Sequence, residues 1–361
     1  MAKDLPVTLD GKVIYHIKLT DSFQGLAEEL KQLGYQADQK ICIISDSNVA
    51  KLYAETVKNI LTKSFPQIFC YEFQAGEASK NTDTVNGVYE FLIQNHFDRH
   101  DLMIALGGGV VGDLTGFTAA TYLRGIDFIQ VPTSLLSQVD SSIGGKTGVD
   151  FDAYKNMVGA FHMPKLVFTN INTLQTLPDN QFSAGMGEVI KHGLIKDAAY
   201  YEWLLENAAD IWARKPEALR KTVTWSNEIK RAVVEKDPTE KGDRMLLNFG
   251  HTLGHAIEKL KNFELLHGEC VALGALAAMK LSENRGMIKP EETNRFKEGK
   301  FHIGTQVSGL EKDAIVAASK NDKKMDSGII KFILIHSIGD AYVDRTVTED
   351  EMKQALDQVL V

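Results

Sequence analysis

The strongest constraint on the fold is an alternation of strand-like and helical segments in the first part of the chain. Short apolar runs that suit buried strands are separated by longer runs with the helical period. Strands joined by helices of this length form βαβ units around a parallel sheet. We therefore predict an α/β domain with a Rossmann-like sheet at residues 1–175. The expected strands are 12–18, 40–45, 68–73, 101–106 and 126–131, and the expected helices are 22–34, 49–65, 81–95 and 114–122.

The pattern changes after about residue 172, where helical periods dominate. We predict an all-α domain at residues 176–361, and 361 residues are enough for two separate cores. Because ligands usually bind where domains meet, we expect the active site in the cleft between them. The expected helices are 183–196, 199–214, 216–235, 250–261, 268–285 and one near Gln354, and strand-like alternation returns only at 329–335.

Charge and composition exclude several partners. A formal net charge of −8 argues against nucleic acid or an anionic membrane. The first residues lack the pattern of a secretory signal, and no apolar run reaches the ~18 residues that span a bilayer. Three widely spaced cysteines indicate no disulfide framework. We therefore expect a cytoplasmic protein with a small-molecule substrate.

A glycine-rich turn follows one expected strand and precedes a helix. Gly107, Gly109 and Gly112 match the pattern G-x-G-x-x-G, in which glycines let the backbone approach a pyrophosphate at a helix N-terminus. The motif comes late for a Rossmann fingerprint, so a tight turn that needs positive φ is the alternative.

Polar residues follow two other expected strands. Asp46 and Asn48 come after one of them, and Glu77 and Lys80 come after the next. Side chains at the carboxyl ends of parallel strands bind ligands in sheet folds. Carboxylates there suit ribose hydroxyls and disfavour a 2′-phosphate, which favours NAD over NADP. A helix N-cap or a solvated turn is the alternative for each.

The segment 138–156 is dense in polar side chains. Lys146 follows two glycines and could meet an oxyanion, with Asp140 placed to pair with it or position it. A P-loop is rejected, because Val139 stands where that motif has its first glycine. Arg124 is a further candidate for an anion contact, and a surface ion pair is its alternative.

A candidate metal site lies in the second half. His251 and His255 are four residues apart and share one face of a helix, while Gly250 and Gly254 leave room for a close approach. Together with His267 and Glu188 they offer the ligand types of a catalytic Zn²⁺. Spacing alone does not say which three of the four bind the metal. Further polar residues on the same stretches are Lys191, Lys230, Arg244 and Asn248.

Seven motifs together resemble the 3-dehydroquinate synthase family, in order and over nearly the whole chain. They are residues 107–113, 131–133, 139–148, 155–156, 187–191, 248–252 and 266–269. The resemblance implies an enzyme that uses NAD and a divalent metal, zinc or cobalt. It implies conversion of 3-deoxy-D-arabino-heptulosonate 7-phosphate to 3-dehydroquinate and phosphate. The implied steps are oxidation by NAD, phosphate elimination, reduction, ring opening and an intramolecular aldol closure, within the shikimate pathway that leads to chorismate and the aromatic amino acids.

The resemblance also implies residue roles. Glu188, His251 and His267 would bind the metal, and Lys191 would lie near the substrate hydroxyls. Lys230 and Arg244 would bind the substrate carboxylate. The phosphate would contact Lys146, Asn156, Asn248, His255, either Lys323 or Lys324, and Arg124 of a neighbouring subunit, which implies a homodimer. The implied NAD contacts are Asp46, Asn48, Gly76, Glu77, Lys80, Gly109, Val110, Val111, Gly112, Asp113, Thr133, Ser134, Asp140, Lys146, Lys155, Thr173 and Thr176.

The chain departs from the family pattern at a few positions. Ser134 stands where a second threonine is common, and Tyr154 replaces a usual glycine. Pro238 and Asp243 interrupt the acidic stretch before Arg244, which puts the shape of that loop in question. The rival hypotheses are a sugar-phosphate cyclase that makes another carbocycle, a polyol dehydrogenase that releases NADH, and a non-catalytic NAD-binding sensor. Lys230 and Arg244 favour the dehydroquinate reaction among the cyclases.

Overall fold

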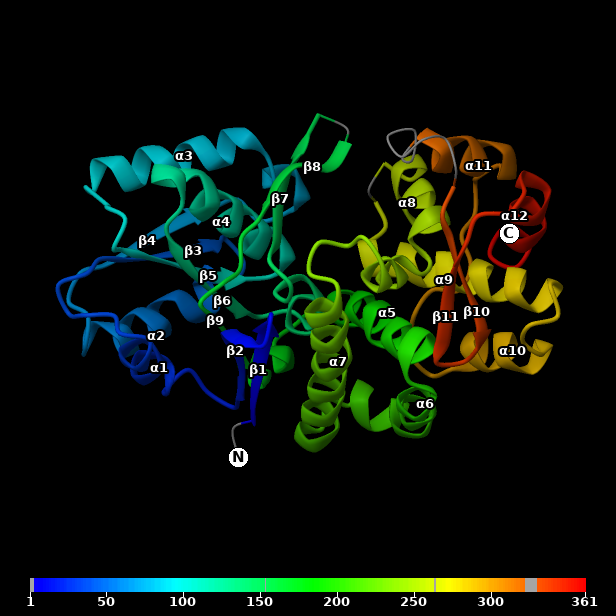
Figure 1. Cartoon of the computed structure of the whole chain (residues 1–361), viewed down its shortest axis with the longest axis horizontal. Helices are drawn as coiled ribbons and strands as arrows, with labels where there is room; N and C mark the ends of the chain where they lie inside the picture. Colours follow the sequence, from blue (N-terminus) through cyan, green and yellow to red (C-terminus); the bar gives the residue numbers. More distant parts are fainter. Residues whose placement is uncertain (1–2, 153, 263, 322–329) are drawn as a thin grey trace. The chain divides into compact units, whose positions relative to one another are not determined.

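The computed structural model describes residues 3–152, 154–262, 264–321 and 330–361. The chain divides into two compact units, Met1–Leu177 and Pro178–Val361 (Figure 1). Each unit has its own core, as the two predicted patterns require. The predicted cleft between the domains stays a prediction.

The first unit is built on a seven-stranded sheet. Its strand order is β1-β2-β9-β6-β5-β3-β4, and all neighbouring strands are parallel except the antiparallel pair β1 and β2. The predicted parallel sheet is therefore confirmed, and β1 and β9 are additions to the prediction. The strands are β1 (Lys3–Leu9), β2 (Lys12–Thr20), β3 (Ile41–Asp46), β4 (Ile68–Phe73), β5 (Leu102–Gly107), β6 (Asp127–Pro132) and β9 (Leu166–Asn170).

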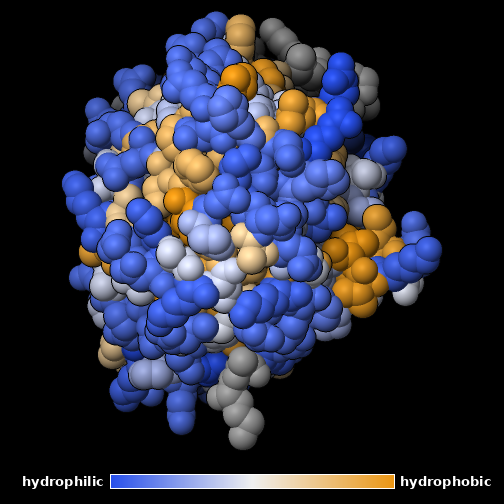
Figure 2. Space-filling model, turned by 90° about the vertical axis from the view of Figure 1, so that its left-hand side faces the viewer, coloured by the Kyte–Doolittle hydropathy of each residue, from blue (hydrophilic) through white to orange (hydrophobic). Residues whose placement is uncertain are grey.

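Helices cover both faces of this sheet (Figure 1). Side chains alternate along a strand, so Ile41 and Ile43 of β3 join one core cluster while Cys42 and Ile44 join the other. This burial on both faces explains why the central strands read as continuous apolar runs. Helices α1 (Leu26–Gln32) and α2 (Ala50–Thr62) supply the first cluster, and α3 (Thr82–Gln94) and α4 (Gly109–Thr121) supply the second. The face shown in Figure 2 is mostly hydrophilic, with hydrophobic side chains in small areas.

A separate hairpin, β7 (Lys146–Phe151) with β8 (Tyr154–Phe161), was not predicted. The hairpin contacts α4 through β7, while four large apolar side chains remain exposed. These are Phe151, Tyr154, Met157 and Phe161.

The second unit is helical, as predicted, and it also carries a two-stranded sheet of β10 (Phe332–Ser337) and β11 (Asp340–Asp344). Helix α9 is buried along most of its length and packs against α5, α8, α10 and α12. No helix among the described residues could cross a membrane. The helices are α5 (Asp179–Lys196), α6 (Ala198–Trp212), α7 (Pro216–Lys236), α8 (His251–Leu260), α9 (His267–Asn284), α10 (Pro290–Glu298), α11 (Lys312–Asn321) and α12 (Glu349–Leu356).

Candidate functional site

Glycines bring α5, α8 and α9 into backbone contact. A Cβ atom added to Gly268 of α9 would lie 1.8 Å from the carbonyl oxygen of Ala184 in α5. One added to Gly274 would lie 1.9 Å from the carbonyl oxygen of Gly250, where α8 begins. Any side chain at these positions would force the helices apart. The expected close approach at Gly250 and Gly254 is therefore that of α9 itself.

This packing assembles the candidate metal ligands. Glu188 comes from α5, His251 and His255 come from α8, and His267 is the first residue of α9. The three histidines each offer one ring nitrogen, and these nitrogens lie within 4.8 Å of one another. Glu188 Oε1 lies 3.8 Å from His251 Nε2 and 3.6 Å from His267 Nε2. Donor atoms about 2.1 Å from a tetrahedral Zn²⁺ lie roughly 3.4 Å apart, so this set fits a divalent metal.

In His251 and His267, the ring nitrogen that faces away from Glu188 lies near a hydrogen-bond acceptor. His251 Nδ1 lies 3.2 Å from the carbonyl oxygen of Phe249, and His267 Nδ1 lies 3.4 Å from Glu258 Oε2. In the neutral form of each ring, a proton on Nδ1 leaves the Nε2 lone pair directed toward Glu188. That is the tautomer that a metal on Nε2 requires.

The two rings differ in proton affinity. Burial, aided by the charge of Lys191, holds the pKa of His251 well below its ordinary value. Burial also disfavours protonation of His267, but hydrogen bonds to Glu188 and Glu258 outweigh it and raise the pKa to about 9. Lys191 forms a close, buried ion pair with Glu188. The cluster is thus a coupled system of carboxylates, imidazoles and one ammonium group.

Three predicted anion contacts lie on neighbouring elements of the second unit. Lys230 of α7 and Arg244 are buried, at 5% and 2% exposure, although both carry charge. Arg244 Nη1 donates to the carbonyl oxygen of Pro238 at 2.6 Å, and Asn248 Nδ2 donates to Glu240 Oε1 at 2.8 Å.

The loop before Arg244 is closed by hydrogen bonds despite its departures from the family pattern. The carboxylate of Asp237 accepts the backbone N–H groups of Lys241, Gly242 and Arg244 at 3.0, 2.6 and 3.1 Å. Sequence analysis missed Asp237, Glu240 and Glu258, and single carboxylates give no periodic signal that could have identified them.

In the first unit, the glycine-rich turn lies where β5 ends and α4 begins. The positive-φ alternative is wrong, because no glycine from Gly107 to Gly112 has positive φ. Gly107 and Gly112 pack instead against side chains, with an added Cβ at 2.4 Å from Val111 and 2.7 Å from Gln130. Helix α4 starts at Gly109, so Gly109, Val110, Val111, Gly112 and Asp113 form its first residues. This geometry suits an anion at a helix N-terminus.

Polar side chains meet beside this turn. Lys80 Nζ donates to Asp113 Oδ2 at 2.7 Å and to Asn156 Oδ1 at 2.6 Å. Lys155 Nζ lies 3.4 Å from Glu77 Oε1. The hairpin therefore brings two predicted residues, Asn156 and Lys155, to the strand-end residues that were predicted to contact NAD.

Other predicted NAD contacts have structural partners as well. Asp46 Oδ1 accepts the backbone N–H groups of Asn48 and Val49 at 2.9 and 3.0 Å, which closes a turn just before α2. The N-cap residue of that helix is Val49, so Asp46 is not its N-cap. Gly76 has φ +122°. Further hydrogen bonds join Thr133 N to Gly107 O, Ser134 to Ser137, Thr173 to Gln138, and Thr176 to Tyr53.

For three further predicted residues the burial or the backbone conformation is known, and two more lie outside the described residues. Asp140 is half-buried, and Lys146 and Arg124 are exposed. Arg124 has φ +68°, in a short turn after α4. Lys323 and Lys324 lie outside the described residues. The functional roles of all these residues stay predictions.

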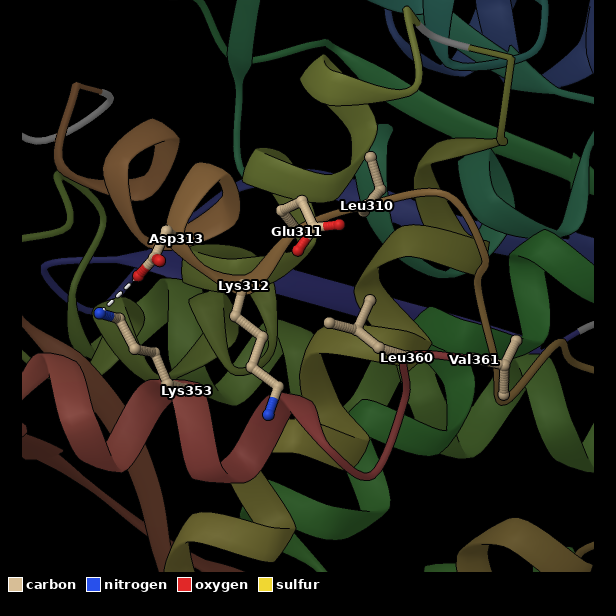
Figure 3. A pocket seen from close by; sticks show the side chains of 7 residues that line it. All are labelled: Leu310, Glu311, Lys312, Asp313, Lys353, Leu360 and Val361. Carbon is tan, nitrogen blue, oxygen red and sulfur yellow. Dashed lines mark ion pairs between the residues drawn. The ribbon is translucent and has the colours of Figure 1, made fainter.

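A surface pocket of about 440 Å³ lies between the start of α11 and the end of the chain (Figure 3). Its charged side chains Asp313 and Lys353 form an ion pair at 2.5 Å. None of the predicted site residues lines this pocket.

Comparisons with known proteins agree with the motifs. Residues 70–184 match the family described as 3-dehydroquinate synthase N-terminal, and residues 185–325 match 3-dehydroquinate synthase C-terminal. The 3-dehydroquinate synthase of Ruminiclostridium cellulolyticum is 41% identical over 340 residues, which cover 94% of each chain.

Solved structures show the same fold. The 2-epi-5-epi-valiolone synthase ValA from Streptomyces hygroscopicus subsp. jinggangensis, solved with NAD⁺ and Zn²⁺, has a TM-score of 0.87 at 26% identity and covers 98% of both chains. A 2-deoxy-scyllo-inosose synthase in complex with carbaglucose-6-phosphate, NAD⁺ and Co²⁺ has a TM-score of 0.87 at 24% identity and covers 99% of both chains. The matched family models and the identity to the curated relative show that this chain belongs to the 3-dehydroquinate synthase family.

Proposed function

We propose that the chain is a phosphorus–oxygen lyase that converts 3-deoxy-D-arabino-heptulosonate 7-phosphate to 3-dehydroquinate and phosphate. The observation that carries the proposal is the convergence of Glu188, His251 and His267, with both Nε2 atoms directed at Glu188. It supports these three residues as metal ligands. His255, whose ring nitrogen lies within 4.8 Å of those of the other two histidines, would contact the substrate. A divalent metal supplies Lewis-acid polarisation of a substrate hydroxyl, and NAD supplies a reversible hydride acceptor.

The side chains of the second unit would orient the substrate. Lys230 and Arg244 are cations held in buried positions, which suits a bound carboxylate. Lys191 lies against Glu188 and can donate hydrogen bonds to substrate hydroxyls. His255 and Asn248 would contact the phosphate. Fixing the leaving group before the elimination lowers the barrier by removing the cost of orientation.

The first unit would hold NAD. The N-terminus of α4, from Gly109 to Asp113, would receive the pyrophosphate. Lys80 is already held by Asp113 and Asn156, so this part of the site is ordered by the protein alone. Lys146 and Asn156 would supply further phosphate contacts from this unit. The other proposed NAD contacts are those that the family resemblance implies.

A homodimer would complete the phosphate contacts through Arg124 of a second subunit. Two observations on the first unit support this proposal. The hairpin exposes Phe151, Tyr154, Met157 and Phe161, and exposed apolar groups of this kind suit a protein interface. His162 Nε2 lies 2.9 Å from the carbonyl oxygen of Ile126, which ties the end of the hairpin to the turn that carries Arg124. Measurement of the solution mass would test it.

Another sugar-phosphate cyclase is the second candidate, since two such enzymes share the fold. Phosphate release should be compared for the heptulosonate phosphate, glucose 6-phosphate and sedoheptulose 7-phosphate, each with NAD and Zn²⁺ or Co²⁺. We expect turnover of the first substrate only, because it alone has a carboxylate for Lys230 and Arg244. Turnover of either sugar phosphate without turnover of the heptulosonate would overturn the proposal.

A further inference from the structure

Glu258 is a buried carboxylate in contact with a candidate metal ligand. It lies on α8, is 2% exposed, and places Oε2 3.4 Å from His267 Nδ1 at the start of α9. Its partner ring faces Glu188 with the opposite nitrogen, at 3.6 Å. The imidazole of His267 thus bridges two carboxylates that come from different helices.

A buried carboxylate is costly unless it is paired, so the position of Glu258 needs a compensating contact. The Nδ1–H group of His267 provides one. As long as Glu258 accepts that proton, the proton that a cation displaces from His267 is the one on Nε2. The ring is also fixed about its Cβ–Cγ bond, because both nitrogens are engaged.

His251 offers an internal comparison. Its Nδ1 meets the neutral carbonyl oxygen of Phe249, whereas the Nδ1 of His267 meets a carboxylate. A carboxylate makes the bonded imidazole more basic than a carbonyl does. In addition, Glu258 adds a negative charge near the cation, where the ammonium group of Lys191 already offsets the charge of Glu188.

We propose that Glu258 is a positioning residue that holds His267 in the tautomer and orientation required by a divalent cation, and so strengthens metal binding without touching the metal. This inference rests on the proposed metal site. A purely structural role as a tie between α8 and α9 explains less, because these helices already meet through the backbone contacts of Gly250 and Gly274.

The test is the metal affinity of chelator-stripped protein, measured by competition for Zn²⁺ against a chromogenic chelator. We expect Glu258→Gln to weaken Zn²⁺ binding about 10-fold and Glu258→Ala up to about 100-fold. The thermal midpoint of the metal-free protein should change little in Glu258→Gln. Glu264→Gln, at an exposed glutamate between the same two helices, is the control for loss of one charge and should bind as the wild type does.

A second measurement needs no variant. Nitrogen NMR of the histidine rings in the metal-loaded wild type should show His267 protonated on Nδ1. Unchanged Zn²⁺ affinity in folded Glu258→Gln, or a proton on Nε2 of His267, would overturn the inference. A wild type that binds no Zn²⁺ would instead refute the metal site and with it the proposed function.

Discussion

The glycines of the two units differ in what surrounds them. In the second unit an added Cβ at Gly187, Gly250, Gly254, Gly268 or Gly274 would meet backbone atoms at 1.8 to 2.6 Å. In the glycine-rich turn of the first unit, an added Cβ at Gly108 or Gly109 would meet only side-chain atoms, the nearest at 3.5 Å in Ser134 and 3.2 Å in Ser141. The first set lets helices touch, whereas the second set leaves space beside a helix N-terminus.

This difference separates two ways of building a site. The metal cluster depends on tertiary packing, because its four residues come from three helices that glycines hold together. The proposed dinucleotide site depends on local chain geometry at the ends of strands. Substitution of the second-unit glycines should therefore damage folding and metal binding together, whereas substitution of Gly108 or Gly109 should affect mainly ligand binding.

Gly274→Ala should have the largest effect. Helix propensity alone would favour alanine by about 1 kcal/mol. We nevertheless expect a loss of about 3 kcal/mol in the free energy of unfolding, because the new methyl group would overlap the Gly250 carbonyl oxygen. Denaturant unfolding and metal content measure both consequences. Gly304→Ala is the control, because nothing lies within 4 Å of a Cβ atom added there. Equal stability of the two variants would contradict the claim that backbone contact requires glycine at position 274.

Glu188→Gln should lose the metal while the protein stays folded. Removing the anionic ligand should weaken metal binding by at least about 100-fold, a larger loss than that expected from a residue outside the first coordination sphere.

His255→Ala should retain the metal and lose turnover, about 100-fold or more if it assists the reacting groups. Elemental analysis after dialysis separates the two variants. Normal metal content in Glu188→Gln would show that the three histidines bind the metal instead.

Gly109→Ala should leave folding nearly intact and weaken NAD binding. The new methyl group would need only a small shift of Ser141, so we expect a change within about 1 kcal/mol in unfolding. NAD affinity should fall about 10-fold or more, because the backbone could no longer approach the pyrophosphate. Calorimetric titration measures this loss. Gly25→Ala, whose added Cβ would lie 4.0 Å from Phe168, is the control. Unchanged NAD affinity in Gly109→Ala would contradict the binding of the pyrophosphate at the N-terminus of α4.

Glu351→Gln should have the smallest effect on the free energy of unfolding. It tests how much an ion pair, as opposed to backbone contacts between helices, stabilises the second unit. Hydrogen bonds from Arg285 lower the pKa of Glu351 from 4.5 to about 2. A lowered pKa means that this stabilisation is complete above about pH 4.5 and disappears as the pH falls through 2. Because the pair is partly exposed, we expect a loss of about 1 kcal/mol at pH 7. Unfolding measured from pH 7 to pH 2 should show the variant and wild type converging in acid, and a constant difference would contradict the assignment.

Much of the fold could be predicted because its signals are local. The strand from Ile68 to Phe73 matches its predicted range, and β3 and β5 differ from theirs by one residue at each end. Burial on both faces produces continuous apolar runs that stand out between amphipathic helices. The hairpin of β7 and β8 escaped prediction because it exposes apolar residues and lies outside the main sheet.

The site could be predicted only in part. The spacing of His251 and His255 and the family motifs identified the cluster of imidazoles and Glu188. The reason for the neighbouring glycines could not be predicted, because the atoms of Ala184 and Gly268 are brought together only by folding. The same holds for Glu258 and Glu240, which acquire their partners His267 and Asn248 through tertiary contacts.

The central claim is a redox-neutral cyclisation in which NAD is regenerated at every turnover. The most direct measurement follows phosphate release and NADH absorbance together, with the heptulosonate phosphate in large excess over NAD and with Zn²⁺ or Co²⁺ present. The account predicts many phosphates released per NAD and no accumulation of NADH. Absence of phosphate release, or one NADH formed for each substrate consumed, would contradict it.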